Sequence, residues 1–330
     1  MFTYFHRRRF LAACLSILAA TVCGTASGAE SATYPSRPVR LMVPFAPGGG
    51  ADALSRIITP KLHDALGQPW VVDNRGGAAG NIAAETVAKA AGDGHTVLMG
   101  FNTVLTVNPS LYKLPYSVEK DLQPVTLLAT AQYILVIHPS VAAGTLKEFI
   151  ALAKQKPDSL NYASAGVGSP LHLAAELFKK RAGISMVHLA YKGGGPAAAA
   201  VLAGEAQVLF ASVASSIPQV KAGRLKALAT TGTKRSRVAP ELPTIAESGF
   251  PGFDVSSWYA LLVPAGTSAA IVNRIRGAAM KAVGMPDVQE AMSRQGLDVE
   301  TSTPQELAAR MKAETAVWAG VIKEAGIKAE

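Results

Sequence analysis

The chain has 330 residues, of which 49% are hydrophobic and 6% aromatic, and its formal net charge is +9. Beyond the arginines at 7–9, the basic residues are scattered, with dense groups at 179–181 and 234–237. Nucleic-acid binding would require a basic stripe interleaved with exposed aromatics, so this composition argues against it. A chain of this length can bury one large core or two smaller ones, and the usual size of a domain favours two.

The first 29 residues are typical of an export signal. Three arginines at 7–9 precede an apolar run at 10–22, and small residues follow as far as Ala29. The run is shorter than the roughly 18 residues that a spanning helix needs. We expect cleavage near Ala29 and export to the periplasm by the general secretory route, with the arginine cluster leaving a twin-arginine route open. Both cysteines lie in this segment, so the exported chain would contain no disulfide and no thiolate.

Short β-branched runs alternate with alanine-rich stretches along the rest of the chain. The pattern predicts strands at 39–45, 70–73, 96–100, 134–137, 160–164, 186–190, 206–212 and 225–230. Apolar residues at helical spacing predict helices at 52–66, 79–90, 146–154, 170–180 and 196–203. Strands that alternate with helices indicate an α/β fold with parallel sheets and helices on both faces.

Two long apolar stretches, residues 125–137 and 255–263, are candidates for strands that cross between domains. No low-complexity linker separates the domains, and the block between the two stretches is about one domain long. We therefore predict a discontinuous first domain, residues 34–131 plus 256–330, and an inserted second domain, residues 132–255. The C-terminal helices are expected to pack back on the first domain.

Three predicted strands run into glycine clusters that open helices. We call them glycine loop 1 (residues 44–52), glycine loop 2 (residues 162–170) and glycine loop 3 (residues 191–196). The N-terminus of a helix attracts anions through unpaired N–H groups and the helix dipole, and ligands of open α/β sheets sit at the carboxyl ends of strands. One such cluster is usually only a tight turn, but three of them in two predicted domains favour a shared ligand.

Two polar residues in these loops have more than one interpretation. Asp52 lies in a first helical turn, where an acid can serve the cap and the dipole or can contact a ligand. His172 follows the helix-start signal Ser169-Pro170, so it can face the cleft or can be a structural histidine. Both interpretations of each residue stay open from the sequence.

The motifs of enzymes and cofactor sites are absent from the sequence. Residues 193–198 have the spacing of a dinucleotide-binding loop, but no acidic residue stands near position 215 to hold a ribose. The chain has no phosphate-binding P-loop, no Gly-x-Ser-x-Gly elbow and no His-Glu-x-x-His pair. We therefore expect no metal, no cofactor and no enzymatic activity. The alternatives are a secreted hydrolase or isomerase, which would need Ser164, Ser169 and His172 as a nucleophile and base, or a sensor acting on a membrane kinase.

Several motifs in order resemble the Bug receptor family, the periplasmic solute-binding components of tripartite tricarboxylate transporters. They are VPFAPGGGAD at 43–52, VDNRGGAAG at 72–80, GVGSPLHL at 166–173, YKGGGPA at 191–197 and ELPTIAESG at 241–249. The resemblance covers nearly all of the chain after the signal. It implies a two-lobed periplasmic binding protein fold, type II-like, with the ligand cleft between the lobes. It also implies a two-component membrane permease as partner, and we expect a monomer.

The resemblance further implies how a ligand is held. Family members bind tricarboxylates, dicarboxylates, acidic amino acids or aromatic acids, largely through backbone amides and ordered waters of two loops that match residues 45–52 and 163–169 here. We expect Phe45 to wall the pocket, Asn102 and Thr103 to line the first-domain side, and Tyr191 and Lys192 to close it from the second. The full set of expected ligand-binding residues is Phe45, Pro47, Gly48, Gly49, Gly50, Asp52, Asn102, Thr103, Ala163, Ser164, Gly166, Gly168, Ser169, His172, Tyr191, Lys192, Gly193 and Ala211.

One departure from the family pattern concerns the ligand. Members often carry acidic residues where Gln207 and Ala211 stand here, and an acid there would suit a ligand with an amino group. Its absence favours a di- or tricarboxylate or an aromatic acid over an amino acid.

Overall fold

The computed structural model describes residues 34–191 and 193–328, so the predicted signal and Lys192 lie outside the described residues. The strands are β1 (Val39–Val43), β2 (Trp70–Asn74), β3 (Thr96–Phe101), β4 (Leu122–Ile137), β5 (Asn161–Ser164), β6 (Val187–Ala190), β7 (Val208–Ser212), β8 (Lys226–Thr230), β9 (Ser256–Pro264) and β10 (Asp298–Val299). The α-helices are α3 (Gly50–Leu66), α4 (Asn81–Ala88), α5 (Asn108–Leu111), α6 (Val118–Asp121), α7 (Leu146–Gln155), α8 (Pro170–Ala182), α9 (Gly194–Leu202), α10 (Val213–Lys221), α11 (Ala269–Val283), α12 (Pro286–Arg294) and α13 (Pro304–Glu324). A 3₁₀ turn, η1 (Ala78–Gly80), and a π-helical turn, η2 (Thr103–Val107), complete the elements.

The strands form one mixed sheet in the order β2-β1-β3-β9-β4-β7-β5-β6, with β8 and β10 also paired to β4. Strands β1, β2 and β3 pair in parallel, as do β5, β6 and β7, but β4 and β9 run antiparallel to their neighbours. The prediction of parallel sheets is therefore wrong for the centre. Parallel neighbours are joined by a covering helix, whereas β4 and β9 connect the two halves of the fold.

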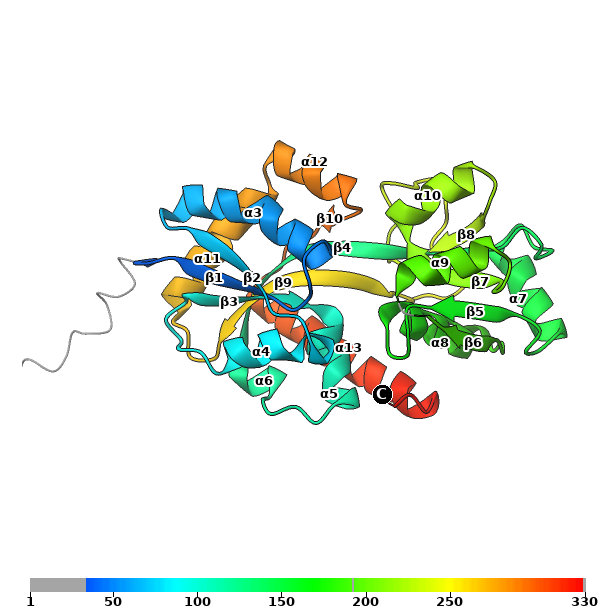
Figure 1. The fold of residues 1–330 in the computed structure, drawn as a ribbon, viewed down its shortest axis with the longest axis horizontal. Coiled ribbons are helices and arrows are strands. Elements are labelled where there is room, and N and C mark those ends of the chain that lie inside the picture. The colour runs from blue at the N-terminus through cyan, green and yellow to red at the C-terminus, as the bar shows by residue number, and fades with distance from the viewer. Residues whose placement is uncertain (1–33, 192, 329–330) are drawn as a thin grey trace, which may run out of the picture.

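Strand β4 belongs to both halves of the sheet. Residues 122–132 pair with β9, and residues 133–137 pair with β7. Strand β9 pairs with β3 and β4, and Val255 just before it lies in the lobe 2 core and donates to the Thr231 carbonyl, so both long apolar stretches cross between the halves. Figure 1 shows the two groups of elements, with β4 and β9 between them.

Buried apolar side chains gather on each side of this junction. We call lobe 1 the group β1, β2, β3, β9, α3, α4, α11 and α12, and lobe 2 the group β5 to β8 with α7 to α10 (Figure 1). One large cluster fills lobe 2, and two clusters fill lobe 1 on the two faces of its sheet. The division into two domains with the boundaries given above stays a prediction.

The last helix, α13, lies along both lobes. Leu307 and Met311 belong to a lobe 1 cluster, whereas Trp318, Val321 and Ile322 belong to the lobe 2 cluster. At about 1.5 Å per residue, a helix of 21 residues is about 31 Å long, which is enough to reach from one lobe to the other. The expectation that the C-terminal helices pack on the first domain is therefore wrong for the last turns of α13.

No helix within the described ranges is both long and apolar enough to span a bilayer.

Candidate functional site

Glycine loop 1 connects β1 to α3 and is held by its own acid. The carboxylate of Asp52 accepts hydrogen bonds from the Gly48 N–H and from Arg56 Nε, both at 3.0 Å. The side chain of Asp52 is buried, and the Arg56 hydrogen bond, with that of Gly48, holds its pKa below the ordinary value. These bonds correspond to the capping interpretation, in which the carboxylate folds the loop back onto the first turn of α3.

The N–H groups at the tip of this loop are unpaired. Gly49 and Gly50 are exposed, and their N–H groups have no acceptor among the described residues. Gly49 is the N-cap of α3, a helix of 17 residues that buries Leu54, Ile58 and Leu62 in lobe 1. The tip of loop 1 therefore presents two free donors at the positive end of a long, well-anchored helix.

Three aromatic rings, which we call the aromatic row, support loop 1. Phe45 meets Phe101 edge to face at 5.3 Å between centroids, and Phe101 lies 5.2 Å from Tyr259. A Cβ added at Gly50 would lie 2.5 Å from Tyr259 Oη, so this ring packs directly against the start of α3. Sequence reasoning missed Phe101 and Tyr259, because they lie on β3 and β9, far from loop 1 in the sequence.

Asn102 and Thr103 stand where β3 ends and the π-helical turn η2 begins. Such turns are frequent at functional sites. Asn102 is buried and donates from Nδ2 to the Ser256 carbonyl at 3.2 Å, while its Oδ1 has no partner in the part of the chain that the structure describes. Asn102 thus ties the end of β3 to the start of β9.

Glycine loop 2 uses most of its donors on itself. The Gly166 N–H donates to Ser164 Oγ at 3.2 Å, and the Gly168 N–H donates to His172 Nδ1 at 3.0 Å. The Ser169 N–H donates to the Gly166 carbonyl, and Ser169 Oγ accepts the His172 N–H as the N-cap of α8. Three N–H groups of loop 2 are therefore bonded locally, while those of Ala165 and Val167 have no acceptor among the described residues.

The serine and histidine pair in loop 2 differs from the one that a hydrolase would need. Ser164 Oγ lies 2.6 Å from Nε2 of His188, a residue of β6 that sequence reasoning missed. Ser164 is buried and already accepts the Gly166 N–H. Within the described residues no carboxylate hydrogen-bonds to His188, so the pair lacks the third group that orients a catalytic base.

Glycine loop 3 opens α9 and lies beside loop 2. The Tyr191 N–H donates to the Ser164 carbonyl at 3.0 Å, which joins the two loops. Gly193 has φ 111°, in the left-handed region that favours glycine. Gly194 and Gly195 are exposed, and their N–H groups find no acceptor in the described chain. Figure 1 shows α3 of lobe 1 beginning at the junction of the lobes, with α9 on the other side of it.

The predicted site residues differ in exposure. Those that are exposed are Pro47, Gly48, Gly49 and Gly50. Those that are half-buried are Phe45, Thr103, Gly166, Gly168, Ser169, Tyr191 and Gly193. Those that are buried are Asp52, Asn102, Ala163, Ser164, His172 and Ala211. Ala211, 6% exposed, pairs with Ile134 inside the sheet and packs in the lobe 2 core.

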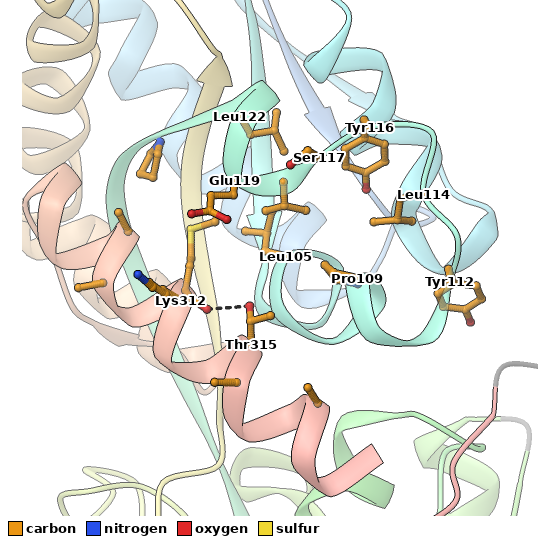
Figure 2. Close-up of a pocket in the computed structure, with 17 residues that line it drawn as sticks. Leu105, Pro109, Tyr112, Leu114, Tyr116, Ser117, Glu119, Leu122, Lys312 and Thr315 are labelled. Atoms are coloured by element: carbon orange, nitrogen blue, oxygen red, sulfur yellow. Dashed lines mark hydrogen bonds between the residues drawn. The ribbon is translucent and has the colours of Figure 1, made fainter. Parts of the chain in front are cut away.

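Two cavities lie away from the glycine loops. The first, about 770 Å³, opens between α13 and residues 105–124, with mostly apolar walls (Figure 2). The Thr315 hydroxyl in its wall donates to the Met311 carbonyl, and the Tyr116 hydroxyl donates to Asn81 Oδ1. The second, about 300 Å³, lies at the junction and includes Asp254 and Arg310. No predicted site residue lines either cavity.

An α/β chain in two lobes that share a strand, with helix N-termini at their junction, has the architecture of a two-lobed solute-binding protein. A family model described as "Tripartite tricarboxylate transporter family receptor" matches residues 54–327. The chain belongs to this family of periplasmic binding proteins, as the sequence motifs indicated. It is a solute-binding protein and not an enzyme.

Curated relatives match over nearly the whole chain. A protein of Pseudomonas sp. (strain P51), "UPF0065 protein in tcbD-tcbE intergenic region", is 39% identical over 96% of this chain and 94% of its own length. "Protein BugT" of Bordetella pertussis is 36% identical over 96% of this chain and 98% of its own length.

Solved structures share the fold. "R. palustris Rpa4515 with adipate" is 34% identical with a TM-score of 0.75 and covers 89% of this chain and 99% of that one. MatC from Rhodopseudomonas palustris with bound malate is 32% identical with a TM-score of 0.71 and covers 88% of this chain and all of that one. The predicted two-lobed fold is therefore confirmed.

Proposed function

We propose that this chain binds a small carboxylate between lobe 1 and lobe 2 and delivers it to a two-component membrane permease. The observation that carries the proposal is the set of free N–H groups at two helix starts, Gly49 and Gly50 on α3 and Gly194 and Gly195 on α9. Unpaired N–H groups and the helix dipole together favour an anion. The adipate and malate bound by structural neighbours are anions of this class.

The three loops would then have different roles. Loops 1 and 3 supply donors from opposite lobes, and loop 2, whose Gly166, Gly168 and Ser169 N–H groups are already bonded, supports loop 3 through the Tyr191 to Ser164 hydrogen bond. Phe45, at the edge of the aromatic row, would contact the carbon chain of the ligand. This division changes the emphasis of the sequence-based expectation, in which loops 1 and 2 form the main clamp.

The residues at positions 207 and 211 support a ligand without an amino group. Both amide atoms of Gln207 are hydrogen-bonded within lobe 2, because its Nε2 donates to the Gly204 carbonyl and its Oε1 accepts the Asn161 N–H. Ala211 is buried and carries no charge. An ammonium group would find no carboxylate at these two positions, so we expect a plain dicarboxylate to bind more tightly than glutamate. Export to the periplasm, cleavage near Ala29 and a monomeric state belong to the same proposal.

Thermal unfolding of protein that has been denatured, dialysed and refolded tests this proposal, because the treatment removes acids that copurify. Adipate, malate, citrate, benzoate and glutamate are compared, with adipamide as the uncharged isostere of adipate. A ligand at 100 times its Kd adds about 2.7 kcal/mol to the free energy of unfolding. Loss of charge-assisted hydrogen bonds should weaken adipamide at least about 100-fold against adipate.

Two results would overturn the proposal. One is equal stabilisation by adipate and adipamide. The other is stabilisation by none of the five acids, together with native mass spectra of protein from its own host that contain no bound acid.

A further inference from the structure

Three parallel rings lie beside glycine loop 2. Tyr162 of β5, His188 of β6 and His172 of α8 stack, with 4.1 Å between the two imidazole centroids and an interplanar angle of 8°. The ring of His188 lies 4.7 Å from that of Tyr162 at 15°. Tyr162 and His172 are buried and His188 is half-buried. Because the rings come from three elements, their packing holds both imidazoles in place without any ligand.

Both imidazoles are bonded to the loop through ring nitrogens. His172 Nδ1 accepts the Gly168 N–H at 3.0 Å, so this nitrogen carries no proton. His188 Nε2 lies 2.6 Å from Ser164 Oγ, and this oxygen accepts the Gly166 N–H. The Ser164 hydroxyl has one proton, which it can donate either to the Gly166 carbonyl at 3.2 Å or to His188 Nε2, so the geometry fixes the unprotonated nitrogen of His172 but not that of His188.

Burial favours the neutral form of the pair, and the two nearest charges act in opposite directions on the pKa of both imidazoles. Glu176 on α8 accepts hydrogen bonds from the Tyr162 hydroxyl at 2.5 Å and from Lys179 Nζ at 2.7 Å. The Glu176 carboxylate raises the pKa of both histidines, and Lys179 lowers it. Burial, with repulsion from His188, lowers the pKa of His172 to about 4, and burial also lowers the pKa of His188. Helix α13 packs against α8, and its Glu324 forms an exposed ion pair with Lys180 of α8.

We propose that His172 and His188 are positioning residues of the ligand site: as a neutral pair they hold glycine loop 2, and protonation of His172 releases the loop. A proton on Nδ1 would face the Gly168 N–H, so two donors would point at each other and the loop must move. Gly166 and Gly168 have φ values of 117° and 73°. The consequence for ligands, a weaker hold on a carboxylate in acid, rests on the proposed function.

The first experiment needs no ligand. The amide resonances of Gly166 and Gly168 are followed by ¹⁵N NMR from pH 7.5 to 3.5 in the ligand-free protein. Gly183, at the other end of α8, serves as the control, because its N–H donates to the Lys179 carbonyl. We expect Gly168 to titrate with a midpoint near 4 and Gly183 to stay unchanged.

Two variants separate positioning from simple packing. His172→Asn keeps an acceptor oxygen but cannot be protonated, so the loop should stay closed and the titration should disappear. His172→Leu removes the acceptor, and the Gly168 amide should exchange with solvent at least about tenfold faster, the scale of one lost hydrogen bond. If the leucine variant does not fold, the pH dependence of the asparagine variant still decides the question.

The second experiment measures the Kd of adipate. At pH 7.5, His172→Leu should raise it about tenfold and His172→Asn less than about threefold. Dividing the Kd of wild type by that of His172→Asn at each pH removes the effect of the titration of adipate itself. This Kd ratio should be about twofold higher at pH 4, where half of His172 is protonated, than at pH 7.5.

The outcomes are separable. A Gly168 amide that does not titrate, or that titrates equally in His172→Asn, overturns the protonation step. Unchanged exchange of the Gly168 amide in His172→Leu overturns the positioning role. If adipate and the other acids fail to bind wild type while Gly168 behaves as expected, the proposed function fails and the role of the histidine pair in the loop stands.

Discussion

A methyl group at Gly50 would collide with Tyr259. The added Cβ would lie 2.5 Å from Tyr259 Oη and 3.3 Å from its Cζ, whereas non-bonded heavy atoms prefer about 3.5–4.0 Å. Tyr259 is only 7% exposed, and its ring packs against Phe101, so it cannot swing into solvent. We therefore expect Gly50→Ala to displace either the ring or the start of α3.

The neighbouring glycine provides a matched control. Nothing lies within 4 Å of a Cβ at Gly49, and its φ of −85° suits any residue. Overpacking costs about 1–3 kcal/mol, and the better helix propensity of alanine recovers at most about 1 kcal/mol. Gly50→Ala should therefore lower the free energy of unfolding by about 1–2 kcal/mol. Gly49→Ala should lower it by about 0.5 kcal/mol, the cost of a poorer N-cap.

Urea denaturation of a double-mutant cycle tests the cause. Tyr259→Phe removes the hydroxyl oxygen that collides, so the double variant Gly50→Ala/Tyr259→Phe should recover about 1 kcal/mol relative to additivity. The adipate Kd should rise about tenfold in Gly50→Ala and return toward wild type in the double variant, because the Gly50 N–H is a proposed donor. Equal stability of Gly50→Ala and Gly49→Ala, or no recovery with phenylalanine, would refute the reasoning.

Three further predictions concern stability, each measured by urea denaturation. Asp52→Ala should lower the free energy of unfolding by about 1–2 kcal/mol, because Gly48 and Arg56 lose their acceptor. Since folding lowers the pKa of Asp52, this contribution disappears as the pH falls through and below 3.8. Equal losses at pH 7 and pH 3 would contradict this prediction. Thr303→Ala should cost about 1 kcal/mol, because it removes the capping box of α13, whereas no loss would mean that the cap is dispensable. The pKa of His172 falls from 6.5 to about 4 on folding, so the unfolded chain binds the proton first as the pH drops. The free energy of unfolding should therefore fall by up to about 3 kcal/mol between pH 6.5 and 4. An identical pH profile in His172→Asn would exclude this group as the cause.

Local signals located most of the elements around the site. The helices α3, α8 and α9 begin within two residues of their predicted starts, because glycine clusters and the Ser169-Pro170 pair act on the backbone next to them. The polar stretch of α10 and the short turns η2, α5 and α6 were missed, because their apolar periodicity is too short to be recognised.

The partners of the loops could not be predicted in the same way. His188 reaches Ser164 from β6, and Tyr259 reaches Gly50 from β9. The sequence separation of these pairs is 24 residues and 209 residues, and no local pattern encodes such contacts. Of the two interpretations left open for His172, the structure favours the structural one, because its Nδ1 holds Gly168.

The sequence by itself determined the α/β class, the three glycine loops at helix starts and the family, since each depends on neighbouring residues or on an ordered set of motifs. Only the tertiary structure decided that β4 joins both halves of a mixed sheet, that α13 lies along both lobes, and that three N–H groups of loop 2 are bonded locally while Gly49 and Gly50 of loop 1 and Gly194 and Gly195 of loop 3 have free ones. The physical reason is that strand direction and hydrogen-bond partners depend on which distant segments meet, whereas caps and periodicity depend on the chain within one or two turns.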